Sequence, residues 1–133
     1  MTVTRMTYVD TSVALAQLLA EDRRPPEALW QEPLVSSRLL EYEVWNRLHA
    51  RRLAASHGDV ARVLFSRLAF LELDRAVVAR ALEPFPEPVR TLDALHLAAA
   101  DFLRQQGVSV AIASYDERFL AASRKLDFAI ADL

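Results

Sequence analysis

Short apolar runs alternate with longer stretches of helical character along the whole chain, and this alternation is the strongest constraint on its fold. The runs that we expect to form strands cover residues 6–9, 34–36, 70–73, 108–113 and 128–130. Parallel neighbours in a sheet need a crossover connection, usually a helix, and helices on both faces bury such a sheet. The sequence therefore predicts a three-layer α/β/α fold in which a parallel five-stranded sheet lies between two helical layers.

Helices are expected between the strands, with ends marked by capping residues and by proline or glycine. Ser37 is expected to cap a long helix that runs to about residue 55, where the His-Gly-Asp sequence at 57–59 marks its end. Asp74 is expected to open a helix to about residue 82, and Thr91 to cap one that ends before residue 107. The other helices are expected between the first strand and about residue 21, over 27–30 and 60–68, and after Asp116.

Length and composition limit what kind of protein this is. The 133 residues fit one domain, which we expect to span 1–133, and a hydrophobic content of 53% is enough to fill its core. No apolar run reaches the roughly 18 residues of a membrane span, and no signal-peptide layout is present, so we expect a cytoplasmic protein. The chain has no cysteine and three histidines, which excludes thiolate zinc sites and leaves oxygen as the ligand for any metal.

Carboxylates gather near the carboxyl ends of two predicted strands. Asp10 follows the first strand directly, Asp116 follows the fourth after two residues, and Asp93 lies in the first turn of the preceding helix. Each aspartate alone is explained as a helix cap or a first-turn acid. If the first and fourth strands are neighbours, however, the three converge where α/β sheets bind ligands. Their mutual repulsion would then call for a cation such as Mg²⁺ or Mn²⁺.

Four segments of the chain resemble the PIN-domain ribonucleases, and specifically the VapC-type toxins of bacterial toxin–antitoxin pairs. They are YVDTS with Asp10, SSRLLEYEVWNRL with Glu43, RTLDALHLAAA with Asp93 and ASYDERF with Asp116. The four segments follow one another in the order and at the spacing of that family, and the resemblance covers essentially the whole chain. The resemblance implies a single PIN domain with strand order 3-2-1-4-5, which places the first and fourth strands side by side. It also implies metal-dependent cleavage of RNA phosphodiesters, a cognate antitoxin protein and a homodimer.

The resemblance further implies roles for individual side chains. Four acidic residues would be both catalytic residues and metal ligands: Asp10, Glu43, Asp93 and Asp116. One or two Mg²⁺ or Mn²⁺ ions held there would lower the pKa of a bound water and offset charge on the phosphate. Ser12 and Ser114 can hydrogen-bond the ligand carboxylates, or serve as ordinary turn hydroxyls. Four arginines can hold RNA phosphates, with a solvated helix face as the competing explanation: Arg47, Arg51, Arg52 and Arg118.

Other acidic side chains compete for the site, and geometry ranks them. Glu41 and Glu43 point to nearly opposite sides of their helix, so only one of them can be a ligand. Glu43 shares its side with polar residues and Glu41 falls among apolar ones, which favours Glu43. Asp101 lies roughly 12 Å along its helix from Asp93, so we interpret it as a solvated residue. Asp74 is interpreted as a helix cap.

The histidine and aromatic side chains near these motifs have structural interpretations as well. His96 stands one helical turn after Asp93, where it either contacts a phosphate or ligand carboxylate or simply hydrogen-bonds its neighbours. Trp30, Trp45 and Phe65 are interpreted as core residues because they lie in helical settings.

Three alternative functions remain open. A phosphatase of the haloacid dehalogenase kind also places an aspartate after the first strand, but it usually has a second one where this chain has Ser12. A non-enzymatic RNA- or protein-binding module would keep the fold and lose acidic positions, and none of the four is missing. A housekeeping PIN nuclease would keep the chemistry and lack the toxicity.

Overall fold

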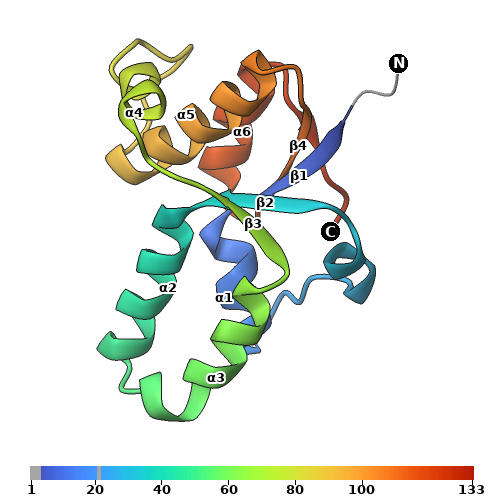
Figure 1. Ribbon diagram of the computed structural model, residues 1–133, viewed down its shortest axis with the longest axis vertical. Coiled ribbons are helices and arrows are strands. Elements are labelled where there is room, and N and C mark those ends of the chain that lie inside the picture. Colours follow the sequence, from blue (N-terminus) through green and yellow to red (C-terminus); the bar gives the residue numbers. More distant parts are fainter. Residues whose placement is uncertain (1–3, 21) are drawn as a thin grey trace.

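A parallel sheet of five strands forms the centre of the computed structural model, which describes residues 4–20 and 22–133 (Figure 1). The strands are β1 (Arg5–Val9), β2 (Leu34–Ser37), β3 (Leu68–Leu71), β4 (Ser109–Ala113) and β5 (Ala129–Ile130). Their order is β3-β2-β1-β4-β5, and every pair of neighbours is parallel. The predicted fold class and strand order are therefore confirmed, although β3 starts two residues earlier than expected.

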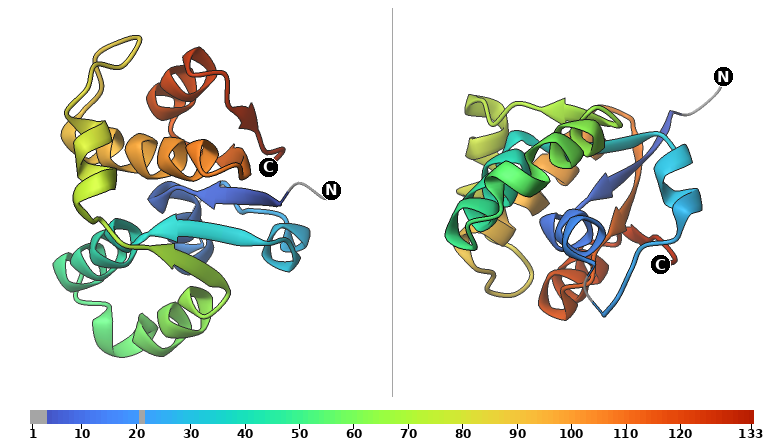
Figure 2. Two further views of the ribbon diagram at one scale, coloured as in Figure 1. Left: turned by 45° about the horizontal axis from the view of Figure 1, so that its top comes forward. Right: turned by 90° about the horizontal axis from the view of Figure 1, so that it is seen from below.

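Helices cover both faces of the sheet (Figure 2). They are α1 (Thr11–Leu19), α2 (Arg38–Ala50), α3 (Ala54–Phe65), α4 (Arg75–Ala81), α5 (Thr91–Gln105) and α6 (Glu117–Lys125), with a short 3-10 helix, η1 (Glu27–Gln31). One hydrophobic core joins α1, α2 and α3 to the sheet, and a second joins α4, α5 and α6. Tyr8 and Val9 belong to different cores because successive strand residues face opposite sides. None of the helices in the described part of the chain has both the length and the apolar character that membrane crossing requires.

The register of β1 against β4 brings two strand ends to the same edge of the sheet. Val9 pairs with Ala113, and the Asp10 backbone N–H donates to the Ala113 carbonyl at 3.0 Å. The chain leaves the sheet just after this pair on both strands, into α1 and α6. Asp10 and Asp116, which stand at the N-cap positions of these helices, are therefore held at one edge by the main chain.

The long predicted helix is interrupted earlier than expected. The chain turns at 51–53, between α2 and α3, instead of at 57–59, and Arg52 has a φ of 57° in this turn. Gly58 lies inside α3, where a Cβ atom would come within 3.1 Å of the Trp45 ring. The glycine thus permits close packing of the two helices and does not end one of them. The prediction was wrong because a glycine in sequence looks the same in both roles.

The capping predictions are mostly confirmed. The Ser37 hydroxyl accepts a hydrogen bond from a backbone N–H of the first turn of α2 at 3.2 Å, and the Asp74 carboxylate does the same for α4 at 3.1 Å. Thr91 was predicted to be the N-cap residue of α5, but it is the first residue of the helix and Arg90 is the N-cap residue. The helix end predicted near residue 21 lies outside the described residues, and α1 ends at Leu19.

The aromatic side chains predicted for the core occupy it to different degrees. Phe65 is buried in the core on the α1, α2 and α3 side of the sheet, as predicted. Trp30 and Trp45 pack against the same core and remain partly exposed. Trp30 also donates from its indole nitrogen to Gln17 at 3.1 Å, which fixes η1 against α1.

Asp101 is buried, contrary to its predicted solvated position. Its side chain is 9% exposed, Arg80 Nε donates to it at 2.6 Å and Arg104 Nη2 donates at 2.9 Å. Burial raises the pKa of the Asp101 carboxyl, but the hydrogen bonds from the two arginines outweigh that effect and hold the pKa below its ordinary value. Asp93 and Asp101 both lie in α5, as the prediction assumed. The spacing along one helix says nothing about Arg80, which reaches Asp101 from α4.

We expect Asp101→Ala to lower the free energy of unfolding by about 3 kcal/mol, because it leaves the Arg80 side chain, which is 13% exposed, without its carboxylate partner. The pair contributes its stability above the ordinary pKa of 3.8 and loses it as the pH falls through the lower folded-state pKa. Urea unfolding at pH 7 measures the effect. The matched control is Asp59→Ala, which removes an exposed ion pair with Arg62 and should change stability by less than about 0.5 kcal/mol.

Candidate active site

Asp10 is held in place by hydroxyl groups, and its side chain does not cap the helix that it precedes. It is 5% exposed, and its Oδ2 accepts hydrogen bonds from Ser12 Oγ and Ser114 Oγ, both at 2.8 Å. Its side chain makes no capping hydrogen bond to α1. The helix-cap interpretation therefore does not account for this aspartate. The two serines contact the carboxylate as predicted.

The two serines also connect Asp10 to the chain segment that carries Asp116. Ser12 Oγ accepts from the Tyr115 backbone N–H at 2.9 Å, and Ser114 Oγ accepts from the Asp116 backbone N–H at 2.9 Å. A hydroxyl can donate one hydrogen bond and accept others, so each serine serves a carboxylate and a backbone amide together. The relative position of Asp10 and Asp116 is fixed by this short network.

Asp93 and Asp116 face a common arginine. Arg90 Nε lies 3.5 Å from Asp93 Oδ2, and Arg90 Nη2 lies 3.3 Å from Asp116 Oδ2. The other oxygen of Asp116 caps α6 by accepting from the Arg118 and Phe119 backbone N–H groups. Burial raises the pKa of the Asp93 carboxyl, and the nearby charges of Asp116 and Asp10 raise it further. The three aspartates thus interact electrostatically, as the convergence argument requires.

Glu43 reaches the same region from α2 and is bound by two side chains. Thr11 Oγ1 donates to Glu43 Oε1 at 2.8 Å, and His96 Nε2 lies 2.7 Å from the same oxygen. Thr11 Oγ1 is also 3.2 Å from His96 Nε2, so the three groups form a compact cluster. These contacts fix Oε1 and leave Oε2 of the carboxylate outside the cluster.

His96 links this cluster to the protein core. Its ring is 1% exposed, and its Nδ1 lies 2.7 Å from the Tyr8 hydroxyl on β1. Burial disfavours the charged ring and lowers its pKa. The Tyr8 oxygen and the Glu43 carboxylate outweigh that effect and raise the pKa of His96 to about 10. In its charged form the histidine makes an ion pair with Glu43.

Glu41 is turned away from the other acidic residues, as the helical wheel predicts. It pairs with Arg38 at 3.5 Å, and Arg38 in turn contacts Glu72 at 2.9 Å on the exposed surface. Glu43 lines the cleft that contains the aspartates, and Glu41 does not. The predicted helix register is therefore correct.

The four carboxylates line one cleft of about 420 Å³, which we call the acidic cleft. Across residues 4–20 and 22–133, no three acidic or histidine side chains stand in an arrangement that would already enclose a metal ion. Arg90 lies between Asp93 and Asp116 and balances their charge as a cation would. The donors fit Mg²⁺ or Mn²⁺, because they are carboxylate oxygens and such hard ions prefer oxygen ligands.

Sequence reasoning missed three contributors to the site. Thr11, Tyr8 and Arg90 all contact the predicted acidic residues or His96. A hydroxyl next to Asp10 and an arginine three residues before Asp93 were visible signals, but either has many ordinary explanations. Tyr8 gave no signal, because a strand aromatic is usually only a core residue.

Comparison with known proteins agrees with this geometry. The PIN domain family model matches residues 7–125. The chain is 31% identical to Ribonuclease VapC47 of Mycobacterium tuberculosis (strain CDC 1551 / Oshkosh), over 95% of this chain and 96% of that protein. Its fold matches the crystal structure of Mycobacterium tuberculosis VapC20, described as a sarcin-ricin loop cleaving toxin, with a TM-score of 0.62. That match covers 87% of this chain and 94% of the other at 18% identity, so it supports the fold alone.

The family model covers most of the chain, and the similarity to a VapC ribonuclease extends over nearly the full length of both proteins. The sequence motifs, the strand order and the acidic cleft are consistent with both findings. The chain therefore belongs to the PIN-domain family, among its VapC-type ribonucleases.

Proposed function

We propose that this chain is a metal-dependent endoribonuclease that acts as the toxin of a type II toxin–antitoxin system. The observation that carries the proposal is the convergence of four carboxylates from four separate segments on the acidic cleft. They are Asp10, Glu43, Asp93 and Asp116, and we propose them as the ligands of Mg²⁺ or Mn²⁺. The alternative haloacid dehalogenase-like phosphatase is disfavoured, because Ser12 donates to Asp10 where that chemistry usually uses a second aspartate.

The side chains of this protein would divide the work of phosphodiester hydrolysis. Ser12 and Ser114 orient Asp10 by donating to one of its oxygens, which leaves the other available. Asp116 uses Oδ1 to cap α6. Its Oδ2 contacts Arg90, which also contacts Asp93. A bound divalent ion would supply Lewis acidity toward the phosphate and a lower pKa for an attacking water.

Arg90 has a second potential role in this reaction. If Asp93 and Asp116 held a divalent ion, the Arg90 guanidinium that now pairs with them would be free to contact a phosphate next to these carboxylates. A planar guanidinium binds phosphate oxygens with two hydrogen bonds. Arg90 would therefore hold the substrate in the loaded enzyme and the aspartates in the metal-free one.

We further propose a cytoplasmic protein of one PIN domain, spanning 1–133, that pairs with a second copy and is inhibited by a cognate antitoxin. An antitoxin segment would have an apolar groove of about 200 Å³ between α1, η1 and α3, lined in part by Leu18, Trp30 and Val63. An arginine of the partner could reach the acidic cleft and compete with the metal.

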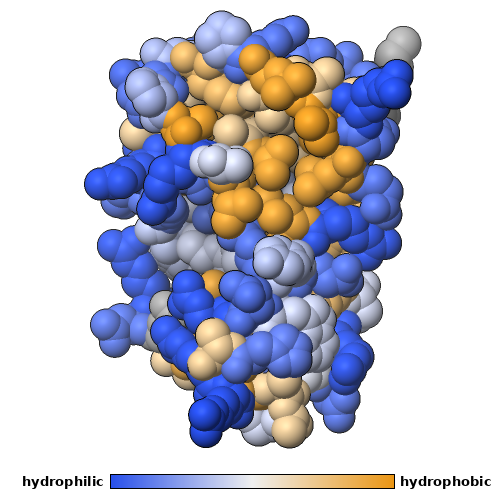
Figure 3. Space-filling model, turned by 90° about the vertical axis from the view of Figure 1, so that its left-hand side faces the viewer, coloured by the Kyte–Doolittle hydropathy of each residue, from blue (hydrophilic) through white to orange (hydrophobic). Residues whose placement is uncertain are grey.

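A second copy would have an apolar surface of its own. Figure 3 shows hydrophobic residues gathered in the upper half of the face that lies on the α4 side of the molecule. The exposed large apolar residues on or next to α4 and α5 are Val78 in α4, Leu82 just after α4, and Leu92 in α5. Contiguous apolar surface of this kind is typical of protein interfaces, which supports a homodimer.

We expect the purified chain to cleave RNA in the presence of Mg²⁺ or Mn²⁺ and to lose this activity when a chelator removes the ion, because four carboxylates need a cation before they can bind a phosphate. Gel analysis of a labelled RNA measures cleavage. Cleavage that persists undiminished in the chelator would contradict the metal-dependent mechanism. Turnover of a small phosphate ester without RNA cleavage would support the phosphatase.

The toxin role is tested separately from the chemistry. Induced expression of the chain should arrest growth of its host, and co-expression of its cognate antitoxin should restore growth through a stable complex. If the purified protein cleaves RNA but the induced chain is harmless without its partner, the chain is a housekeeping nuclease.

A further inference from the structure

A second groove continues from the acidic cleft and carries basic and aromatic side chains. It has a volume of about 630 Å³, and we call it the arginine groove after Arg23, Arg47 and Arg51, which line it together with Tyr115. Arg47 and Asp116 line both the arginine groove and the acidic cleft. A strand that passes through the cleft can therefore continue into this groove without leaving the surface.

Two of these arginines form a stripe on the helix that carries Glu43. Arg47 follows Glu43 by four residues in α2, and Arg51, four residues further on, is the C-cap residue of that helix. The two arginines therefore lie on the same side of α2, about 6 Å apart along its axis. In residues 4–20 and 22–133, no acidic side chain lies within ion-pair distance of either arginine. Their charges are thus available to an anionic ligand.

Tyr115 adds a flat aromatic surface next to the acidic residues. Its backbone N–H donates to Ser12 Oγ, and the next residue is Asp116, so the position of the ring is tied to that of the cleft. The ring packs partly on the core and remains partly exposed, with the Arg23 guanidinium 5.6 Å from its centre. Guanidinium groups and nucleobases use the same kind of contact with an aromatic face.

Another groove, which adjoins the acidic cleft at Arg90 and Asp93, has the opposite character. Three carboxylates line it, from Glu87, Asp93 and Glu117, against two arginines, and Glu87 is paired with Lys125 at 2.6 Å. Of the two arginines, Arg90 already pairs with Asp93 and Asp116. Among the residues that the structure describes, the arginine groove has three arginines against Asp22 and Asp116. A polyanion is therefore attracted more strongly to the arginine groove than to the groove at Arg118.

We propose that the arginine groove binds the single-stranded RNA next to the scissile phosphate, with Arg47 and Arg51 on successive phosphates and one base stacked on Tyr115. This inference rests on the proposed nuclease function and adds the path of the substrate. The strand is single because a base can stack on a side chain only after it has left its neighbours in a helix. Stacking makes the site tolerant of base identity, since every base has a flat face.

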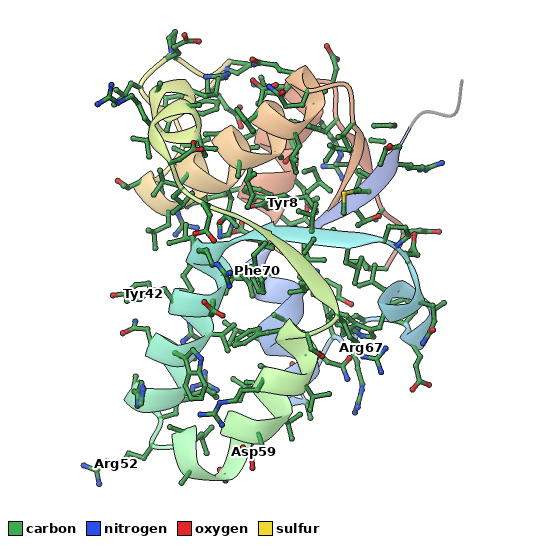
Figure 4. The ribbon with its side chains drawn as sticks, in the orientation of Figure 1. Tyr8, Tyr42, Arg52, Asp59, Arg67 and Phe70 are labelled. Atoms are coloured by element: carbon green, nitrogen blue, oxygen red, sulfur yellow. The ribbon has the colours of Figure 1, made fainter. Side chains whose placement is uncertain are left out.

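The test is RNA binding by the full-length chain in a chelator, where no cleavage is expected. The probe is a labelled, unstructured oligouridylate of about 12 nucleotides, followed by fluorescence anisotropy over a range of salt concentrations. Arg51→Gln should weaken binding about fivefold and lower the salt slope by about 0.7, the value for one lost phosphate contact on a single strand. The matched control is Arg52→Gln. Arg52 neighbours Arg51 but extends away from the molecule, and its variant should bind as the wild type does (Figure 4).

The stacking contact has a different signature. Tyr115→Leu should weaken binding about tenfold without changing the salt slope, because it removes an aromatic surface and no charge. Tyr115→Phe keeps the ring and should bind as the wild type does. Equal folding of all variants is checked by thermal unfolding, so that a loss of binding reports the contact itself.

The inference is overturned if Arg51→Gln and Arg52→Gln bind RNA equally well, or if Tyr115→Leu binds like Tyr115→Phe. It is also overturned if Arg118→Gln weakens binding as much as Arg51→Gln, since the strand would then not favour one groove. Failure of the nuclease proposal looks different: the variants would bind RNA in the expected order, and no metal would make the wild type cleave it.

Discussion

Asp93→Asn is expected to reduce RNA cleavage to background, a loss of about 10³-fold or more, while the protein stays folded. The substitution keeps the shape of the side chain and removes a negative charge from the acidic cleft. An amide neutralises no positive charge, so a divalent ion would be bound more weakly and placed less accurately. Asp10→Asn and Asp116→Asn should have the same effect, because the three carboxylates share one cleft.

The stability of the variant gives an independent readout. Burial and the charges of Asp116 and Asp10 raise the pKa of Asp93 in the folded state. An acid whose folded-state pKa is raised lowers stability once the pH exceeds its unfolded-state pKa, because folding then opposes its ionisation. Asp93→Asn removes this cost, so its melting temperature at pH 7 without metal should equal or exceed that of the wild type. In saturating Mg²⁺ the wild type should gain more stability than the variant.

The control for this experiment is Asp59→Asn. Asp59 is an exposed aspartate on α3 and does not line the acidic cleft. The same chemical change there should leave both cleavage and the response to Mg²⁺ unaltered. Wild-type cleavage by Asp93→Asn would remove Asp93 from the site and with it the proposed ligand set.

Glu43→Gln is expected to lose most of the nuclease activity, by about 100-fold or more, whereas Glu41→Gln should keep nearly all of it. The two glutamates are two residues apart on α2, so the pair is matched in residue type and in helix. Glu43 lines the acidic cleft and is held there by Thr11 and His96. Glu41 makes only an exposed pair with Arg38, and such pairs contribute little.

Both activity and metal affinity should be measured for this pair. Calorimetric titration with Mn²⁺ should show weaker binding to Glu43→Gln and unchanged binding to Glu41→Gln. An amide at position 43 also removes the charge that faces His96, so the pKa of His96 should fall from about 10, which NMR titration of the ring detects. If Glu41→Gln is the inactive variant, α2 in the active enzyme turns Glu41, and not Glu43, toward the acidic cleft.

Much of the fold could be predicted because its signals are local. Apolar runs identified every strand to within a few residues, and Ser37 and Asp74 marked helix starts by their capping chemistry. The strand order came from the family resemblance and not from periodicity. Gly58 misled the prediction, since only the nearby Trp45 ring explains why a glycine occupies the interior of α3.

The candidate site was predictable where strand ends determine it. Asp10 and Asp116 meet because parallel neighbours end at the same edge of a sheet, and that geometry follows once β1 and β4 are paired. The choice of Glu43 over Glu41 follows from the period of the helix. The structure agrees with both, and the roles of these residues as metal ligands remain predictions for the experiments above.

The sequence by itself determined most of the elements, some of their capping residues and the candidate carboxylates, because these depend on side-chain chemistry and on periods of two or 3.6 residues. Only the tertiary structure decided which distant side chains meet. Arg80 reaches Asp101 across 21 residues, and His96 reaches Glu43 across 53. Both contacts arise from the packing of one helix on another, and this packing is set by the fit of whole surfaces. A buried ion pair leaves no local pattern in the chain, since each partner alone looks like an ordinary charged residue.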